Sequence, residues 1–329
     1  MIASIAHGGG LIAAQRLFPD APKPWLDLST GINPHAYPVG ELARECWTRL
    51  PEADDIAALE AVAAQTYGAR DAAGVVAAPG AQSLIQLLPF VCPARNVAVL
   101  APTYAEHAYR WRRSGAEVRE VDAPDTEVDC DVVVAVHPNN PDGRVLSIDA
   151  IARIADRQTA RGGLLVLDES FADVLPDEAS FIPHMGARNV VVLRSFGKFY
   201  GLAGVRLGFA VASPALAARL RDALGPWPVS GAAVAVGQRA LSDRSWRTAM
   251  RRRLIEDTTQ LDDLLRAAGL HVLGGTPLFR LIETKDAQAL WRRLGECGIL
   301  VRAFADAPHR LRFGVPGSTS DRTRLVTAL

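Results

Sequence analysis

The chain has 329 residues, a length that exceeds one small module and suits one large domain or two unequal ones. Lysine and arginine together number 36, as do aspartate and glutamate, so the formal net charge is zero. This balance excludes a general electrostatic attraction to nucleic acid or to an anionic membrane, and any bound anion must be held by a few local groups.

The chain begins with a segment rich in glycine and proline, residues 1–40, which we expect to form an N-terminal arm rather than a domain. Its first ten residues lack the basic and the long apolar regions of a signal peptide, so the sequence predicts a cytoplasmic protein. The four cysteines are dispersed without a CxxC motif, and we therefore expect reduced thiols and no metal site.

The middle of the chain alternates between short apolar runs and stretches that suit helices. The runs are rich in valine and leucine without polar alternation, as in strands that are buried on both faces. Strands are expected at 74–78, 97–101, 132–136, 164–167 and 190–193, and helices at 105–114 and 148–161. This pattern predicts a three-layer α/β/α fold with a mostly parallel sheet between two layers of helices.

Residues 72–94 carry no charge and are numerous enough to cross a membrane. Three prolines and two glutamines interrupt this stretch. A buried strand, a turn and a helix therefore suit it better than a membrane span, and no membrane partner is expected.

The pattern changes after the sequence Gly-Pro-Trp-Pro at 225–228. A long amphipathic helix is expected at about 230–268, followed by strands near 271–273, 278–283 and 310–315. These elements predict a small α+β domain. We therefore expect a large domain at 41–224 and a small C-terminal domain at 225–329.

Polar groups follow each of the five predicted strands, and in open α/β sheets ligands bind beyond the carboxyl ends of the strands. In chain order they are Gly80, Ala81 and Gln82 at the start of a helix, then Tyr104, Asn140, Asp168, and finally Ser195 and Lys198. Each alone has an ordinary structural interpretation as a helix cap, a turn residue or a solvated lysine. Their ordered occurrence on successive strands is what indicates a site.

This combination of groups suits pyridoxal phosphate. A lysine amine forms a Schiff base with the aldehyde, a carboxylate keeps the pyridine nitrogen protonated, and an aromatic ring stacks on the pyridine. The phosphate requires backbone N–H groups at a helix N-terminus together with a hydroxyl and an arginine.

Five motifs carry a resemblance to a known family. They are PTY at 102–104, PNNPDG at 138–143, LDES at 167–170, SFGK at 195–198 and GLAGVRLGF at 201–209. With them the chain resembles the fold-type I pyridoxal-phosphate enzymes of the class I/II aminotransferase superfamily over nearly its whole length. The resemblance implies pyridoxal 5'-phosphate as the cofactor and a homodimer as the assembly.

The resemblance also implies a role for each matching residue. Lys198 is similar to the Schiff-base lysine, Asp168 to the partner of the pyridine nitrogen, and Tyr104 to the stacking aromatic residue. The residues similar to those that bind the ring 3-oxygen and the cofactor phosphate are Asn140, Gly80, Ala81, Gln82, Ser195 and Arg206. Arg312, in LRFGVPG at 311–317, resembles the arginine that binds the substrate carboxylate.

The subfamily follows from HGGG at 7–10, WLDLSTGINP at 25–34 and TRLPE at 48–52. These segments resemble the threonine-phosphate decarboxylases of cobalamin biosynthesis, which are relatives of the histidinol-phosphate aminotransferases. The implied reaction is decarboxylation of L-threonine O-3-phosphate to (R)-1-amino-2-propanol O-2-phosphate. An aminotransferase of the histidinol-phosphate type remains the alternative, because the same arginine could serve either reaction.

Such a substrate carries a phosphate and a carboxylate, which a chain of zero net charge must bind with local groups. The candidates are His7 and Gly8 with the following glycine backbone, Asn33, Asn140, Arg144 and Arg312.

Three positions depart from the pattern of the relatives. Phe171 replaces a tyrosine whose hydroxyl meets the ring 3-oxygen, Leu50 replaces a tyrosine that reaches the neighbouring subunit's cofactor, and Gly197 replaces a serine or threonine. We expect the cofactor phosphate to depend more on Ser195, Arg206 and the helix N-terminus as a result.

Overall fold

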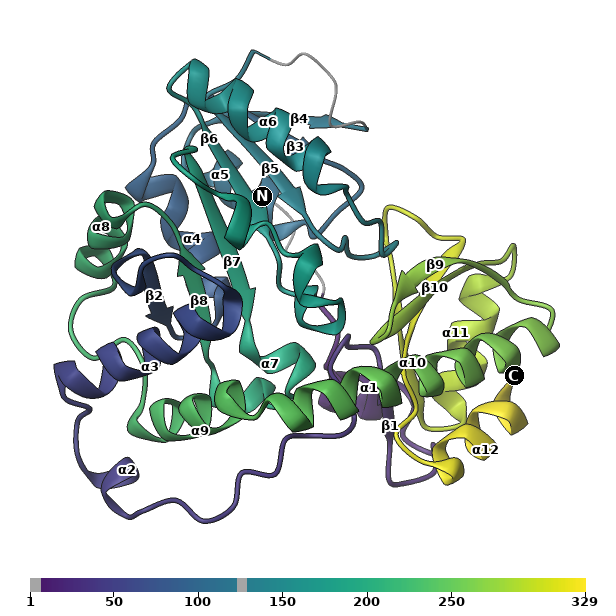
Figure 1. Cartoon of the computed structure of the whole chain (residues 1–329). Helices are drawn as coiled ribbons and strands as arrows, with labels where there is room; N and C mark the ends of the chain where they lie inside the picture. Colours follow the sequence, from purple (N-terminus) through teal and green to yellow (C-terminus); the bar gives the residue numbers. More distant parts are fainter. Residues whose placement is uncertain (1–6, 123–128) are drawn as a thin grey trace. The chain divides into compact units, whose positions relative to one another are not determined.

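The computed structural model describes residues 7–122 and 129–329 and divides into two compact units (Figure 1). The larger unit contains Tyr37–Asn140 and Val145–Trp246. The smaller unit contains the described residues of Met1–Ala36 together with Pro141–Arg144 and Arg247–Leu329. Residues 1–6 of the predicted arm lie outside the described residues.

The larger unit is built on a seven-stranded sheet. Across the sheet the strands are β2 (Val75–Ala78), β8 (Gly208–Val211), β7 (Val190–Ser195), β6 (Leu164–Asp168), β5 (Val132–Val136), β3 (Asn96–Leu100) and β4 (Glu117–Val121). The five strands from β7 to β4 run parallel, whereas β8 is antiparallel to both of its neighbours. The predicted mostly parallel sheet is therefore confirmed, and the carboxyl ends of β5, β6 and β7 lie at one edge.

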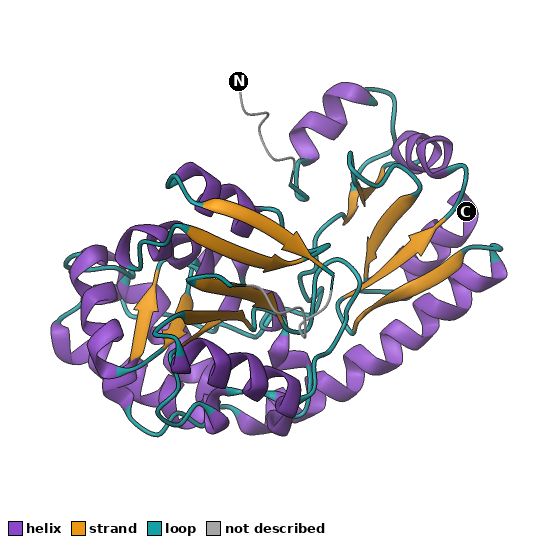
Figure 2. Cartoon of the chain, turned by 90° about the horizontal axis from the view of Figure 1, so that it is seen from above, coloured by secondary structure: helices purple, strands orange, loops and turns teal. Residues whose placement is uncertain are grey.

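Helices lie on both faces of this sheet, as Figure 2 shows. The helices of the larger unit are α2 (Glu45–Thr48), α3 (Ala53–Tyr67), α4 (Ala81–Val91), α5 (Glu106–Arg113), α6 (Ile148–Ala160), α7 (Phe196–Phe199), α8 (Pro214–Leu224) and α9 (Gly231–Ser242). One face forms a core in which valines of the central strands pack against α4, α5 and α8, with Trp111 fully enclosed. Burial of these strands on both faces explains their unbroken apolar sequence.

Short 3₁₀ turns connect the longer elements of the larger unit. They are η1 (Ala72–Gly74), η2 (Ala172–Val174), η3 (Asp177–Ala179), η4 (Ile182–His184) and η5 (Ala203–Val205). Two of them, η2 and η5, follow the functional segments at the ends of β6 and β7.

The smaller unit is built on a five-stranded sheet. Its strands, in spatial order, are β1 (Leu26–Leu28), β11 (Ile299–Ala303), β12 (Arg310–Gly314), β10 (Phe279–Glu283) and β9 (His271–Thr276). Only the β1–β11 pair is parallel. The helices of this unit are α1 (Leu11–Leu17), α11 (Ala287–Glu296), α12 (Thr319–Ala328) and α10 (Arg244–Ala267) from Arg247 onward.

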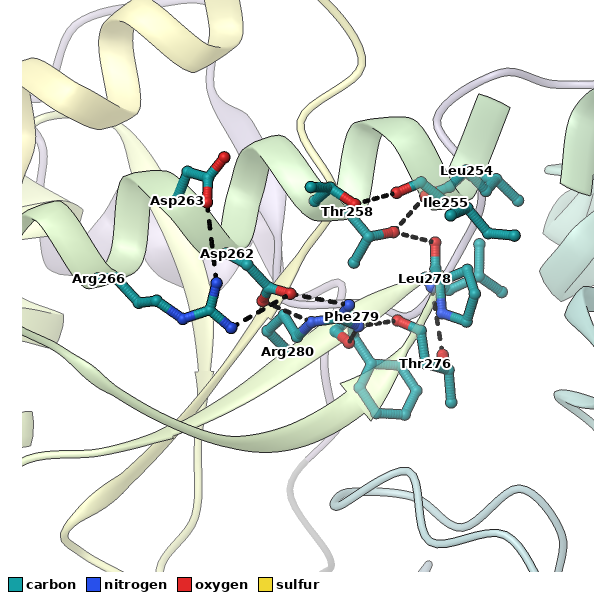
Figure 3. Close-up of polar contacts among 12 residues, drawn as sticks. Leu254, Ile255, Thr258, Asp262, Asp263, Arg266, Thr276, Leu278, Phe279 and Arg280 are labelled. Atoms are coloured by element: carbon teal, nitrogen blue, oxygen red, sulfur yellow. Dashed lines mark hydrogen bonds and ion pairs between the residues drawn. The ribbon is translucent and has the colours of Figure 1, made fainter. Parts of the chain in front are cut away.

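Polar side chains of helix α10 form hydrogen bonds with the β9–β10 hairpin, as Figure 3 shows. Asp262 accepts a hydrogen bond of 2.7 Å from Arg280 Nε, and the Thr258 hydroxyl donates to the carbonyl of Pro277 at 3.2 Å. Arg280 also donates to the carbonyl of Thr276 at 2.7 Å. These bonds fix β10 on the helix and with it the buried ring of Phe279.

The helix expected at 230–268 is two helices. Asp243 separates α9 from α10, and its carboxylate accepts hydrogen bonds from the Trp246 backbone N–H and the Ser245 hydroxyl, at 2.9 and 2.8 Å. An aspartate that accepts such a bond starts a new helix. The expected strands at 271–273, 278–283 and 310–315 correspond to β9, β10 and β12.

The compact units differ from the expected boundaries at 40/41 and 224/225. Strand β1 pairs with β11, so the N-terminal segment belongs to the smaller unit rather than standing apart as an arm. Helix α9 packs against α3 and belongs to the larger unit. Both differences arise from pairings between segments that are distant in the sequence.

Among residues 7–122 and 129–329, no helix combines the length and the apolar character needed to cross a membrane. The same residues contain no cluster of three or more His, Cys, Asp and Glu side chains suited to a metal ion.

Candidate active site

Asp168, the last residue of β6, is buried and doubly held. Nε2 of His107 lies 2.8 Å from its Oδ2, and the Ser170 backbone N–H donates to its Oδ1 at 2.8 Å. His107 comes from α5 and is 2% exposed. Burial acts to raise the pKa of Asp168, but the hydrogen bond and charge of His107, together with the hydrogen bonds of Ser170, outweigh it and hold the pKa below its ordinary value. The carboxylate is therefore ionised in the interior.

Lys198 lies in α7, just after β7, and its side chain is half-buried. Its Nζ is 5.7 Å from the centre of the Phe171 ring, which is itself buried. Phe171 therefore presents an aromatic face to the amine. The loop after β6 thus supplies both the carboxylate of Asp168 and a neighbour of the lysine.

Gly197 shows why this chain has no hydroxyl residue before the lysine. A Cβ at this position would lie 2.8 Å from the Cα of Ala203, which is closer than real side chains approach backbone atoms. The turn η5 packs directly on Gly197. A serine or threonine would require that turn to move.

Five residues meet at the N-terminus of α4. Gly80 is its N-cap, with φ of +84°, and a Cβ there would lie 2.6 Å from Nη2 of Arg206. A Cβ on Gly208 would lie 2.4 Å from the backbone nitrogen of Ala81, and Gly208 pairs with Ser195 across β8 and β7. The two glycines let the arginine and the helix start come together. Among the described residues no side chain caps this helix.

The side chain of Gln82 is occupied by its neighbours. It accepts a hydrogen bond of 3.0 Å from the Tyr104 hydroxyl and donates one of 2.7 Å to Glu106. Arg110 donates to the same Glu106 oxygen at 2.8 Å. Gln82 thus orients Tyr104, and its backbone N–H is the group that lies in the first turn of α4.

The Tyr104 turn is also held from the strand beside it. Asn139, which is fully buried, donates from Nδ2 to the carbonyl of Pro102 at 2.8 Å and accepts from the Thr103 hydroxyl at 2.6 Å. The neighbouring Asn140 is half-buried and is the last residue of this part of the larger unit. The ring of Tyr104 lies edge-on to His107, with centroids 6.1 Å apart.

In the smaller unit, Ser29 joins the N-terminal glycines to Arg312. Its hydroxyl accepts from the Gly9 backbone N–H at 2.7 Å and donates to Asp27 at 2.6 Å, while its carbonyl accepts from Nη2 of Arg312 at 3.0 Å. A Cβ on Gly8 would lie 2.3 Å from that same carbonyl oxygen. Close approach of the two segments therefore requires glycine at position 8.

Arg312 is 7% exposed and its Cζ lies 4.8 Å from the centre of the Phe279 ring. The buried Asn33 accepts a hydrogen bond from the His35 backbone N–H at 2.8 Å. His7 is exposed beside Gly8. Arg144 follows a turn whose Gly143 lies against the backbone of Gly275.

The larger unit therefore holds every residue expected to bind the cofactor, and the smaller unit holds His7, Gly8, Asn33 and Arg312. Three supporting residues escaped the sequence reasoning: His107, Asn139 and Ser29. His107 stands three residues after Tyr104, which places both on one side of α5 and its preceding turn, and this spacing was the available signal. Ser29 carries no comparable signal, because Gly9 and Arg312, the two segments that it joins, are far from it in the sequence.

Comparisons with known proteins agree with this architecture. The family model described as aminotransferase class I and II matches residues 24–329. A threonine-phosphate decarboxylase from Sinorhizobium sp is 42% identical, covering all of this chain and 98% of that protein. A histidinol-phosphate aminotransferase from Erythrobacter litoralis is 30% identical, covering 84% of this chain and 81% of that protein.

Among solved structures, the chain is similar to histidinol-phosphate aminotransferase from Sinorhizobium meliloti in complex with pyridoxal-5'-phosphate. The TM-score is 0.85 at 20% identity, covering all of this chain and 98% of that one. At this identity the likeness shows the fold alone.

Proposed function

Because the chain belongs to the aminotransferase class I and II family, we propose that it is a pyridoxal-phosphate-dependent decarboxylase of L-threonine O-3-phosphate. The products are (R)-1-amino-2-propanol O-2-phosphate and carbon dioxide, and the reaction belongs to cobalamin biosynthesis. The observation that carries this proposal is the 42% identity over the full chain to a threonine-phosphate decarboxylase, against 30% over less of the chain to a histidinol-phosphate aminotransferase.

The residues of the larger unit fit pyridoxal 5'-phosphate. The guanidinium of Arg206 lies beside Gly80 at the start of α4, where the backbone N–H groups of Ala81 and Gln82 lie, and Ser195 pairs with Gly208, which packs on Ala81. Helix N-termini and arginines suit a phosphate dianion. Because Gly80 has no Cβ, the guanidinium of Arg206 can approach the start of the helix. Because Gly197 has no hydroxyl, Ser195 is the proposed hydroxyl donor at this site.

When bound, the cofactor supplies a carbonyl for amine exchange and a protonated pyridine ring that accepts electrons from the substrate Cα. We assign to Asp168 the task of holding the pyridine proton, since its carboxylate remains ionised while buried. His107 keeps that carboxylate oriented, and Tyr104 supplies the aromatic face. Asn140 is the proposed donor to the ring 3-oxygen. Phe171 has no hydroxyl and cannot make this contact.

Lys198 is the proposed catalytic lysine. The residue is half-buried, with its amine beside Phe171, and Nζ can donate a proton to the substrate Cα in place of the carboxylate that leaves. In the smaller unit, Arg312 is the proposed partner of the substrate carboxylate, because an arginine binds a carboxylate through two parallel hydrogen bonds. His7, the Gly8 backbone and Asn33 are the proposed groups for the substrate phosphate, near the chain that Ser29 ties to Arg312.

A direct assay tests the reaction. Purified protein supplied with pyridoxal phosphate and L-threonine O-3-phosphate should release carbon dioxide without a 2-oxo acid. If 2-oxoglutarate were required and glutamate accumulated, the histidinol-phosphate type of amino transfer would be the activity instead.

We also propose that the protein acts as a cytoplasmic homodimer. Exposed apolar side chains near α2, Trp47 at 68% and Leu50 at 63%, support association of two copies through this segment. Sedimentation should show a dimer, and a monomeric species of full activity would contradict it.

A further inference from the structure

A buried cluster of charged side chains adjoins the two strand ends that carry Asp168 and Ser195. Glu169 follows Asp168 at the end of β6, Arg194 precedes Ser195 in β7, and Asp173 lies in η2. None of the three is more than 4% exposed. The proposed reaction uses none of them directly, so the burial of three charges needs another explanation.

Arg194 binds both carboxylates of the cluster. Its Nη1 donates to Glu169 at 2.8 Å and its Nη2 donates to Asp173 at 2.5 Å, while its guanidinium carbon lies 4.3 Å from the centre of the Tyr67 ring. Glu169 also accepts from the Ser180 hydroxyl and the Phe181 backbone N–H, each at 2.7 Å. The cluster thus ties β7 to the whole segment that follows β6.

The loop between the two carboxylates contains the residues that contact the proposed site. The Ser170 backbone N–H donates to Asp168, and the Phe171 ring faces the amine of Lys198. Because Arg194 holds residues 169 and 173, four positions apart, it fixes both ends of this loop. The Glu169 backbone N–H also donates to the carbonyl of Leu193, the residue before Arg194.

The two carboxylates of the cluster keep Arg194 charged. Burial alone would lower the pKa of Arg194, but the attraction of Asp173 and Glu169 outweighs it, so its pKa lies above the usual value. The guanidinium is thus permanently charged. If it were removed, two carboxylates would remain buried with no cation between them, and the loop would lose the bonds that hold both of its ends.

We propose that Arg194 is a positioning residue for the cofactor site: by binding Glu169 and Asp173 it fixes the loop through which Ser170 orients Asp168 and Phe171 faces Lys198. This inference rests on the proposed function. It assigns to Arg194 no contact with the cofactor or the substrate.

The planar fork of arginine is the feature that the proposal requires. Two carboxylates at different places can each take one nitrogen of a guanidinium, whereas a lysine offers a single point charge. Arg194→Lys therefore keeps the positive charge and should keep the fold, but a single nitrogen in place of two should hold the two ends of the loop less well. Asp173→Asn releases one end only.

The test compares these two variants with Arg188→Lys. Arg188 stands just before β7 and binds Asp156 at 2.6 Å in an exposed ion pair, so its replacement by lysine controls for the chemistry of the substitution. The measurements are the dissociation constant for pyridoxal phosphate by absorbance titration, the pH midpoint of the visible band, kcat at saturating cofactor, KM, and thermal unfolding of the cofactor-free protein.

Arg194→Lys should weaken cofactor binding and lower kcat by about tenfold each, a loss typical of outer partners that orient functional groups. The pH midpoint of the visible band should shift, while KM stays within about twofold of the parent because the proposed substrate groups lie in the smaller unit. Asp173→Asn should show the same pattern more weakly. Arg188→Lys should match the parent protein in all five measurements.

Arg194→Lys protein with parental cofactor affinity, pH midpoint and kcat would overturn the inference. If its unfolding temperature were lower while those three values were unchanged, the cluster would be purely structural. A parent protein that binds no pyridoxal phosphate would instead refute the proposed function, so the two failures are distinguishable.

Discussion

The two compact units assemble their functional groups in different ways. In the larger unit, Asp168 and Lys198 follow neighbouring parallel strands, so chain order and sheet order agree. In the smaller unit, Gly8 and Arg312 meet through Ser29, and 283 positions separate Ser29 from Arg312. The first arrangement follows from the topology of a parallel sheet. The second depends on a pairing between the two ends of the chain.

The difference also concerns electrostatics. The buried charge of Asp168 is held by His107 and a backbone N–H, so its ionisation is settled within the unit. Arg312 contacts a neutral carbonyl and an aromatic ring. Under the proposed function, the larger unit holds the resident cofactor and the smaller unit binds the exchangeable substrate anion. The following four predictions test this contrast.

The largest effect is expected at Lys198. Lys198→Ala should lower activity by at least about 10³-fold, because in the proposed function this amine both binds the cofactor and donates the proton. It should also abolish the visible band that borohydride reduces. Lys285→Ala, at an exposed lysine of the smaller unit, should change neither property. A borohydride-reducible band that persisted in Lys198→Ala protein would refute the lysine assignment.

Arg312→Lys should raise KM for the phosphorylated substrate by about 10- to 100-fold, since a bidentate charge-assisted contact contributes about 1.5–3 kcal/mol. The affinity for pyridoxal phosphate should be unchanged, because Arg312 belongs to the smaller unit. Arg310→Lys, in the same strand but paired with Glu283, is the matched control. Loss of cofactor binding in Arg312→Lys protein would contradict the proposal that the larger unit binds the cofactor and Arg312 binds the substrate.

Gly80→Ala should weaken cofactor binding by roughly tenfold, because the new Cβ displaces Arg206 from the start of α4. Gly115→Ala is the control, because it introduces the backbone strain of a positive φ without a clash. Gly115 also has a positive φ, of +95°, but a Cβ there meets no atom within 4 Å. Both variants should lose about 1–2 kcal/mol of unfolding free energy from the positive φ, and only Gly80→Ala should lose cofactor affinity. Equal cofactor affinity in the two proteins would contradict the role of Arg206.

The smallest effect is on stability. Asp168→Asn should lower the unfolding free energy of the cofactor-free protein by about 1–3 kcal/mol at neutral pH, because a buried hydrogen-bonded ion is lost. The folded pKa of Asp168 is depressed, so its stabilisation is present above the ordinary carboxyl pKa and is lost as the pH falls through the folded value. Denaturant unfolding should therefore show the two proteins converging in acid. A difference that stayed constant into strong acid would count against the ionised state.

Much of the larger unit could be predicted from the sequence. The five apolar runs correspond to β2, β3, β5, β6 and β7, and the functional residues follow their ends. Two strands of this unit, β4 and β8, escaped the pattern. The sequence of β4, Glu-Val-Arg-Glu-Val, is that of an edge strand with polar side chains, and no such strand gives an unbroken apolar run.

The supporting contacts were not predictable in the same way. The spacing of His107 from Tyr104 indicates a shared side of the helix but not the carboxylate that His107 contacts, and Arg194 looks like any polar residue in a strand. Only the tertiary structure shows that both are buried partners of carboxylates. Gly197, noted as a departure from relatives, is explained by the position of Ala203, which no spacing rule indicates.

By itself, the sequence determined the sheet and the order in which reactive groups leave it, because the carboxyl ends of parallel strands share one edge. It also determined the absence of an overall charge that could attract anions, which leaves the task to single residues such as Arg206 and Arg312. Only the tertiary structure decided how these residues are held. Burial makes an unpaired charge costly, so the fold pairs Asp168 with His107 and Arg194 with two carboxylates, and such pairings join segments whose separation in the chain carries no pattern.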